Sequence, residues 1–211
     1  MINKFNKLAF VGQMGAGKDT VAALFKDTHK SFAFGTGIRE CVKILRAEGV
    51  GSAFLFLRDI MLKPTRCYEL LGILEIAKKF PKTFKDRQIL QYLGSSARVH
   101  VDSIWIDYCL TQIKKSGAEK VVLTDCRRVP ELEALKAEGF ILIYVDAPVE
   151  VRFKRLEGRD GIDRDEFIKT SQHLAESEIG SLKDLCDYVI DNSSDELRFA
   201  EEQLNKIIKE G

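Results

Sequence analysis

Five short apolar runs divide the chain, at residues 8–11, 31–34, 121–123, 141–145 and 188–190. Runs of this length predict buried strands, because the strands of a parallel sheet are covered on both faces and need no polar alternation. Longer stretches with apolar positions at helical spacing lie between them. Strands that alternate with helices predict an α/β fold in three layers, with helices on both faces of a central parallel sheet.

The helical stretches are of unequal length. The first follows residues 12–20, and its apolar face is formed by Val21, Leu24 and Phe25 at i, i+3 and i+4. A small-residue turn, Gly35-Thr36-Gly37, is expected after the second run. Residues 52–100 are almost wholly helical in pattern, with turn signals at 63–64 and 80–81, and residues 104–113 continue it. A final helix presents an inner face that comprises Leu197, Ala200, Leu204, Ile207 and Ile208.

A glycine-rich loop follows the first apolar run. It fits the phosphate-loop pattern GxxxxGK, in which glycines let backbone N–H groups turn toward a phosphate and the lysine reaches the β- and γ-phosphates. A glycine-rich turn with a chance lysine is the less favoured interpretation, because the loop lies between a strand and an amphipathic helix. The residues predicted to hold ATP here are Gly12, Gln13, Met14, Gly15, Ala16, Gly17, Lys18, Asp19 and Thr20.

Two aspartates are candidate ligands for Mg²⁺. Asp19 stands where the pattern usually has Ser or Thr, and a carboxylate there can bind the metal directly or through water. The alternative is an acid favoured at a helix N-terminus. Asp125 follows the third strand, where it can hold Mg²⁺ through water; a cap or an ion pair with Arg127 is its alternative. Ligands of parallel sheets bind beyond the carboxyl ends of the strands, which here also carry Asp146 and Asn192.

Several segments resemble known kinases. GQMGAGKDT resembles the phosphate loop of deoxynucleoside monophosphate kinases, especially the phage type. FAFGTGIRE at 32–40, DRQILQYLG at 86–94 with Arg98, and TDCR at 124–127 with Pro130-Glu131 are similar to further segments of that family, whereas residues 50–83 match poorly. The segments VDAP (145–148), RDG (159–161) and DYVIDN (187–192), with Arg152 and Arg155 between the first two, resemble dephospho-coenzyme A kinase, and RLEGR (155–159) resembles the lid hinge of adenylate kinases.

The resemblance implies one P-loop kinase domain over residues 1–211. Its core would be 1–34, 101–151 and 180–211, with a helical monophosphate-binding insertion at about 35–100 and a lid at about 152–179. The implied activity is Mg²⁺-dependent phosphorylation of a (deoxy)nucleoside 5′-monophosphate by ATP. The further residues that the resemblance assigns are Arg155, Arg159 and Asn192 toward ATP, Arg39, Arg87, Gln91, Arg98 and Arg127 toward the acceptor, and Lys18, Asp125, Arg127 and Arg159 in catalysis.

Two other functions stay open. Transfer to the ribose hydroxyl of dephospho-coenzyme A requires a base, and no clear carboxylate follows the second strand, whereas a monophosphate oxygen is already a nucleophile. A nucleotide-switch protein is the alternative from another class, although no NKxD sequence is present. Arg152 is interpreted as structural.

The composition limits the classes of partner that the protein is expected to bind. With 33 Lys and Arg against 32 Asp and Glu, the net charge is +1, which does not favour nucleic acid or an anionic membrane as a partner. No apolar run approaches the roughly 20 residues of a membrane helix. The five scattered cysteines favour free thiols in a reducing compartment, so the cytoplasm is the simplest location. The expected partners are therefore small nucleotides, with the protein a monomer or homodimer.

Overall fold

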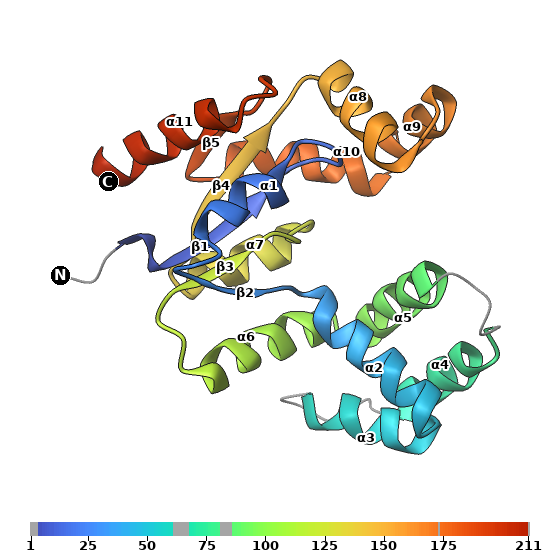
Figure 1. Cartoon of the computed structure of the whole chain (residues 1–211). Coiled ribbons are helices and arrows are strands. Elements are labelled where there is room, and N and C mark those ends of the chain that lie inside the picture. Colours follow the sequence, from blue (N-terminus) through green and yellow to red (C-terminus); the bar gives the residue numbers. More distant parts are fainter. Residues whose placement is uncertain (1–3, 61–67, 81–85, 173, 211) are drawn as a thin grey trace. The chain divides into compact units, whose positions relative to one another are not determined.

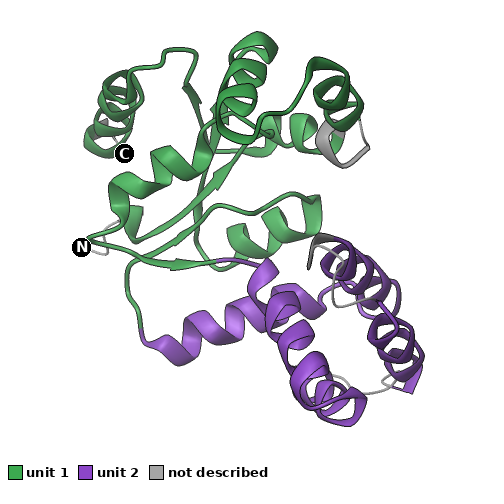
Figure 2. Cartoon of the chain, turned by 45° about the vertical axis from the view of Figure 1, so that its right-hand side comes forward, with its two compact units in different colours: residues 1–32, 118–211 green, residues 33–117 purple. Residues whose placement is uncertain are grey.

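The computed structural model describes residues 4–60, 68–80, 86–172 and 174–210 (Figure 1). The turn signals at 63–64 and at residue 81 lie outside these residues. The chain forms two compact units: unit 1 comprises residues 1–32 and 118–211, and unit 2 comprises residues 33–117 (Figure 2). Within the described ranges, no helix is long and apolar enough to cross a membrane.

Unit 1 contains a five-stranded sheet in the order β2-β3-β1-β4-β5, and all neighbouring strands are parallel. Its strands are β1 (Lys7–Val11), β2 (Lys30–Phe32), β3 (Val121–Leu123), β4 (Ile141–Asp146) and β5 (Tyr188–Asp191). The three central strands are almost wholly buried, whereas the two edge strands are partly exposed. The predicted α/β fold with a central parallel sheet is confirmed.

The helices of unit 1 cover both faces of this sheet. They are α1 (Lys18–Ala22), α7 (Val129–Ala137), α8 (Val149–Asp160), α9 (Arg164–Ser171), α10 (Leu174–Ser181) and α11 (Leu197–Glu210), with short 3-10 helices η1 (Lys4–Asn6), η2 (Ala23–Phe25) and η3 (Leu182–Leu185). Leu8 and Phe10 of β1 pack with Val21 of α1 and Leu204 of α11 in one core cluster. Side chains alternate along a strand, so Ala9 points to the opposite face.

The strand order determines where a ligand can bind. β1 lies between β3 and β4: the chain leaves β1 toward β2 on one side, whereas it leaves β3 toward β4 on the other side of β1. A crevice forms at such a switch point, beyond the carboxyl ends of the strands. The predicted phosphate loop, residues 12–20, begins at this end of β1.

Unit 2 is helical and has its own core. Its helices are α2 (Gly35–Ala47), α3 (Val50–Ile60), α4 (Tyr68–Lys78), α5 (Asp86–His100) and α6 (Ile104–Ser116). Cys41 and Leu45 of α2 pack with Leu74 of α4, Leu93 of α5 and Trp105 of α6. The indole Nε1 of Trp105 donates a hydrogen bond of 3.1 Å to the carbonyl oxygen of Gly94, so the largest buried side chain leaves no polar atom unpaired.

The expected turn at Gly35-Thr36-Gly37 is wrong. β2 ends at Phe32, and α2 already begins at Gly35. A Cβ at position 37 would lie 2.7 Å from Cδ1 of Tyr108 on α6. The glycine therefore reflects a close approach between two helices, which sequence pattern alone does not distinguish from a turn.

Two apolar positions were also assigned wrongly to a buried face. Leu24 is 37% exposed, because α1 ends at Ala22 and the chain tightens into a 3-10 turn that rotates the next side chains. Ile208, in the last turn of α11, is also 37% exposed. The remaining predicted face of α11 is buried or packs against the core cluster.

Candidate phosphate-binding site and acceptor cavity

The loop after β1 adopts a conformation that requires glycine. Gly15 and Gly17 have φ values of 79° and 88°, in the left-handed region that other residues rarely occupy. A Cβ on Gly12 would lie 2.6 Å from the carbonyl oxygen of Val145. The backbone N–H of Ala16 donates to the carbonyl oxygen of Gln13 at 3.1 Å, which closes the turn. Glycine is thus required at positions 15 and 17 by the backbone conformation, and at position 12 by the close approach of Val145.

Asn192 secures the loop from the end of β5. Its side-chain Nδ2 donates to the carbonyl oxygen of Ala16 at 2.7 Å, and its backbone N–H donates to that of Asp146 at 2.7 Å. The residue is 6% exposed. Asn192 was predicted to bind ATP, whereas in this structure its side chain donates its hydrogen bond to the backbone of the loop. It ties together the loop, β4 and β5.

Lys18, Asp19 and Thr20 begin α1. Lys18 is only 13% exposed in its side chain, and its Nζ lies 3.6 Å from Oδ2 of Asp19, which is 69% exposed. Thr20 is exposed. An exposed carboxylate beside a half-buried ammonium can bind a metal ion without first losing a buried contact.

Two arginines of α8 approach the loop differently. Nη2 of Arg155 donates to the carbonyl oxygen of Ser194 at 2.7 Å, while its Nη1 is buried without a hydrogen-bond partner and lies 3.7 Å from the Cβ position of Gly17. Arg159 is exposed and makes two hydrogen bonds to Asp160, of 2.8 and 2.6 Å. This contact raises the pKa of Arg159, and Asp19 adds to the effect. Arg155 is therefore fixed at the loop, whereas Arg159 is held by its neighbour.

The segment after β3 carries Asp125 and Arg127. Asp125 is half-buried, and Arg127 is exposed. The backbone N–H of Arg127 donates to Oε2 of Glu131 at 2.8 Å, and Glu131 is only 2% exposed. Glu131 therefore orders this segment. Sequence reasoning included Glu131 in a motif but gave it no role.

Two further charged residues make contacts that the sequence did not predict: Lys183, which it did not single out, and Arg152, which it assigned a structural role. Lys183 of η3 donates from Nζ to Oδ2 of Asp146 at 2.6 Å, and this contact raises the pKa of Lys183. Arg152 of α8 is buried beneath the loop. Spacing could not predict either contact, because each joins residues more than 30 positions apart.

The predicted acceptor residues are divided between the units. Arg127 belongs to unit 1, and Arg39, Arg87, Gln91 and Arg98 belong to unit 2. Arg39 is exposed on α2 and donates to Oγ1 of Thr36 at 3.4 Å. Gln91 is exposed and Arg98 half-buried on α5. Arg87 also lies on α5, but its side chain is outside the described part of the structure.

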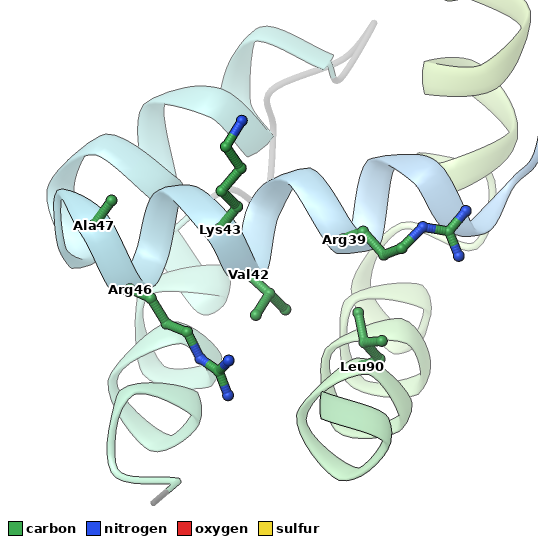
Figure 3. A pocket seen from close by; sticks show the side chains of 6 residues that line it. All are labelled: Arg39, Val42, Lys43, Arg46, Ala47 and Leu90. Carbon is green, nitrogen blue, oxygen red and sulfur yellow. The ribbon is translucent and has the colours of Figure 1, made fainter. Parts of the chain in front are cut away.

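A cavity of about 490 Å³ lies beside α2 within unit 2 (Figure 3). Its lining residues are Arg39, Val42, Lys43, Arg46, Ala47 and Leu90. α2 provides three cations over two turns, and Leu90 extends toward that helix from α5 (Figure 3). The structure thus places one predicted acceptor residue, Arg39, in a cavity, together with two basic residues that were not predicted.

Comparison with known proteins identifies distant relatives. No family model matches the chain. It is 39% identical over 74 residues to a UPF0200 protein of Methanosarcina mazei, which is 34% of this chain and 40% of that protein. It is 23% identical over 189 residues to a UPF0200 protein of Saccharolobus islandicus, which covers 84% and 91% of the two chains. The chain spans less than half the length of the Methanosarcina relatives that it matches.

Among solved structures, TT1252 from Thermus thermophilus matches with a TM-score of 0.55 and 18% identity over 96% of both chains. This likeness shows a shared fold. A dephospho-CoA kinase from Campylobacter jejuni matches over 98% of this chain and all of its own, with a TM-score of 0.45 and 16% identity, which is too distant to bear on function.

Proposed function

We propose that this protein is an ATP-dependent kinase that phosphorylates a (deoxy)nucleoside 5′-monophosphate. The observation that carries the proposal is the loop at residues 12–20, whose left-handed glycines let backbone N–H groups turn toward a bound polyphosphate and whose Ala16 carbonyl oxygen is bound by Asn192. Phosphoryl transfer requires mainly positioning and charge stabilisation, so a rigid loop with adjacent cations is the principal requirement.

The charges around the loop suit the donor phosphates. Lys18 is half-buried at the loop, and Arg155 directs a buried, unpartnered Nη1 toward it. A buried donor without a partner is costly, and a phosphate oxygen would relieve that cost. Arg159 would contribute after exchanging Asp160 for phosphate.

Mg²⁺ would be held by Asp19 and Asp125 together with phosphate oxygens, since this ion commonly takes one or two carboxylates plus substrate phosphates. When bound, it would neutralise charge on the β- and γ-phosphates. Asp19 is exposed, and Asp125 follows β3, the strand that neighbours β1. This donor set fits the ion without a dedicated protein cage.

The cavity of unit 2 suits the acceptor. Arg39 and Arg46 could contact a phosphate group, whereas Lys43 pairs with Glu40 at 3.4 Å. Val42, Ala47 and Leu90 offer apolar contact for a base. Among its described lining residues there is no carboxylate to deprotonate a hydroxyl. A monophosphate oxygen needs no such base, which favours a nucleoside monophosphate over dephospho-coenzyme A as acceptor.

The decisive test is ADP release from ATP and Mg²⁺ with a panel of nucleoside monophosphates, ribo and deoxyribo, alongside dephospho-coenzyme A. We expect rapid release only when a monophosphate is added. Release with dephospho-coenzyme A alone would identify the hydroxyl acceptor instead. ATP binding without release for any acceptor would favour a nucleotide switch.

Arg39→Ala should lower kcat/KM for the acceptor monophosphate. Loss of one charge-assisted contact corresponds to about 1.5–3 kcal/mol, or roughly one to two decades in kcat/KM for the monophosphate. The Kd for ATP should be unchanged. Arg58→Ala is the matched control, because Arg58 is an exposed arginine of the same unit that pairs with Asp59. Weaker ATP binding with normal acceptor kinetics would mean that the two substrates are assigned to the wrong units.

Asp19→Asn and Asp125→Asn should each raise the Mg²⁺ concentration that gives half-maximal rate, because one negative charge near the metal is removed. We expect an increase of about tenfold, similar to the loss of one charged contact. Asp165→Asn, an exposed acid on α9, is the control. An unchanged Mg²⁺ dependence for Asp19→Asn would favour the helix-terminus explanation, and for Asp125→Asn a cap.

A further inference from the structure

Arg152 is a buried cation directly beneath the phosphate loop. It is 6% exposed, and its carbonyl oxygen lies 2.7 Å from the Cβ position of Gly15. Its Nη1 donates to the carbonyl oxygen of Met14 at 3.4 Å. The backbone of Arg152 therefore lies close against Gly15, and its side chain is hydrogen-bonded to the carbonyl of Met14.

The charge of Arg152 is poorly compensated. Its Nε is buried without a hydrogen-bond partner, and the bond to Met14 is long. Its Cζ lies 5.9 Å from the ring centroid of Phe167 on α9, a weak attraction compared with an ion pair. The nearby Glu150 is instead bound by Arg164 through two hydrogen bonds, of 2.9 and 2.6 Å. No ion pair of Arg152 occurs among the described residues.

A buried charge without a counter-ion is expensive to keep for stability alone, and an apolar side chain of similar size is often neutral or stabilising there. A polyphosphate on the loop would supply the missing negative charge. We propose that Arg152 is a positioning residue for the donor nucleotide: it holds the Met14–Gly15 turn and provides positive potential beneath the phosphates. This inference rests on the proposed function, because it presumes that the loop binds a nucleotide.

The test compares Arg152→Met and Arg152→Lys with wild type in two measurements. One is the thermal melt without ligand, and the other is the Kd for ATP and for inorganic tripolyphosphate, which carries no base or ribose. Arg152→Met should melt at or above the wild-type temperature yet bind both ligands about tenfold more weakly. Arg152→Lys should recover most of the affinity. Arg198→Met, an exposed arginine on α11, should change neither property.

The outcomes distinguish a positioning role of Arg152 from a purely structural one, and either from a failure of the proposed function. If Arg152→Met melts lower than wild type and binds both ligands normally, Arg152 is merely structural and the inference is wrong. If only the Kd for ATP changes, the residue acts on the base or ribose, which also overturns it. If wild type binds neither ATP nor tripolyphosphate, the proposed function itself fails.

Discussion

Lys18→Ala should lower kcat by roughly 100- to 1,000-fold, the range found when one preorganised donor to a developing charge is removed. The side chain of Lys18 is 13% exposed, and its Nζ lies 3.6 Å from Oδ2 of the exposed Asp19. Its removal should therefore leave the fold intact while transfer slows. The measurement is the steady-state rate of ADP formation at saturating ATP and monophosphate.

The thermal melt of the Lys18→Ala protein must accompany the kinetics, because an unfolded variant would also be inactive. Lys26→Ala, a lysine that follows η2 outside the loop, is the control. Near-normal activity in a folded Lys18→Ala protein would refute the assignment of the loop as the donor site.

Gly15→Ala should weaken ATP binding at least tenfold and reduce the free energy of unfolding by about 1–3 kcal/mol. Position 15 has a φ of 79°, and the new Cβ would lie 2.7 Å from a backbone oxygen of α8, which cannot rotate away. Either the loop or α8 must shift. Calorimetric titration with ATP and denaturant unfolding measure the two effects.

Gly158→Ala is the matched control for this substitution. Gly158 lies on α8, the helix that Gly15 approaches, and no other atom comes within 4 Å of its Cβ position. Alanine should therefore stabilise the helix by about 0.5–1 kcal/mol without changing ATP affinity. If Gly15→Ala bound ATP with wild-type affinity, the loop would tolerate a side chain at a position where the structure leaves no space for one.

Local patterns were sufficient to predict the sheet. The apolar runs that became β1, β3 and β4 lie in fully covered positions, so hydrophobicity alone identifies them. The glycine loop was also predictable, because its spacing reflects backbone geometry that few other residues adopt. Strand order was not, since the position of β1 between β3 and β4 depends on pairing between distant segments.

Side-chain environment explains what the sequence could not reveal. Arg152 and Arg155 lie on one helix, and the sequence could assign them different roles but not their contacts: Arg152 is buried beneath the loop and Arg155 is anchored by Ser194. Gly37 looked like a turn residue because the ring of Tyr108 that excludes a side chain is 71 positions away. Each of these roles is set by tertiary contacts, which leave no mark on spacing.

The bond from Asn192 to Ala16 joins residues that are 176 positions apart. During synthesis, the glycine motif leaves the ribosome well before its partner, which is added 176 residues later. Domains generally fold as units as the chain emerges, and long-range pairing is slow. An incomplete chain therefore lacks the contact that fixes the loop. Tight nucleotide binding should be acquired only once β5 has joined the sheet, which makes it a measure of completed folding.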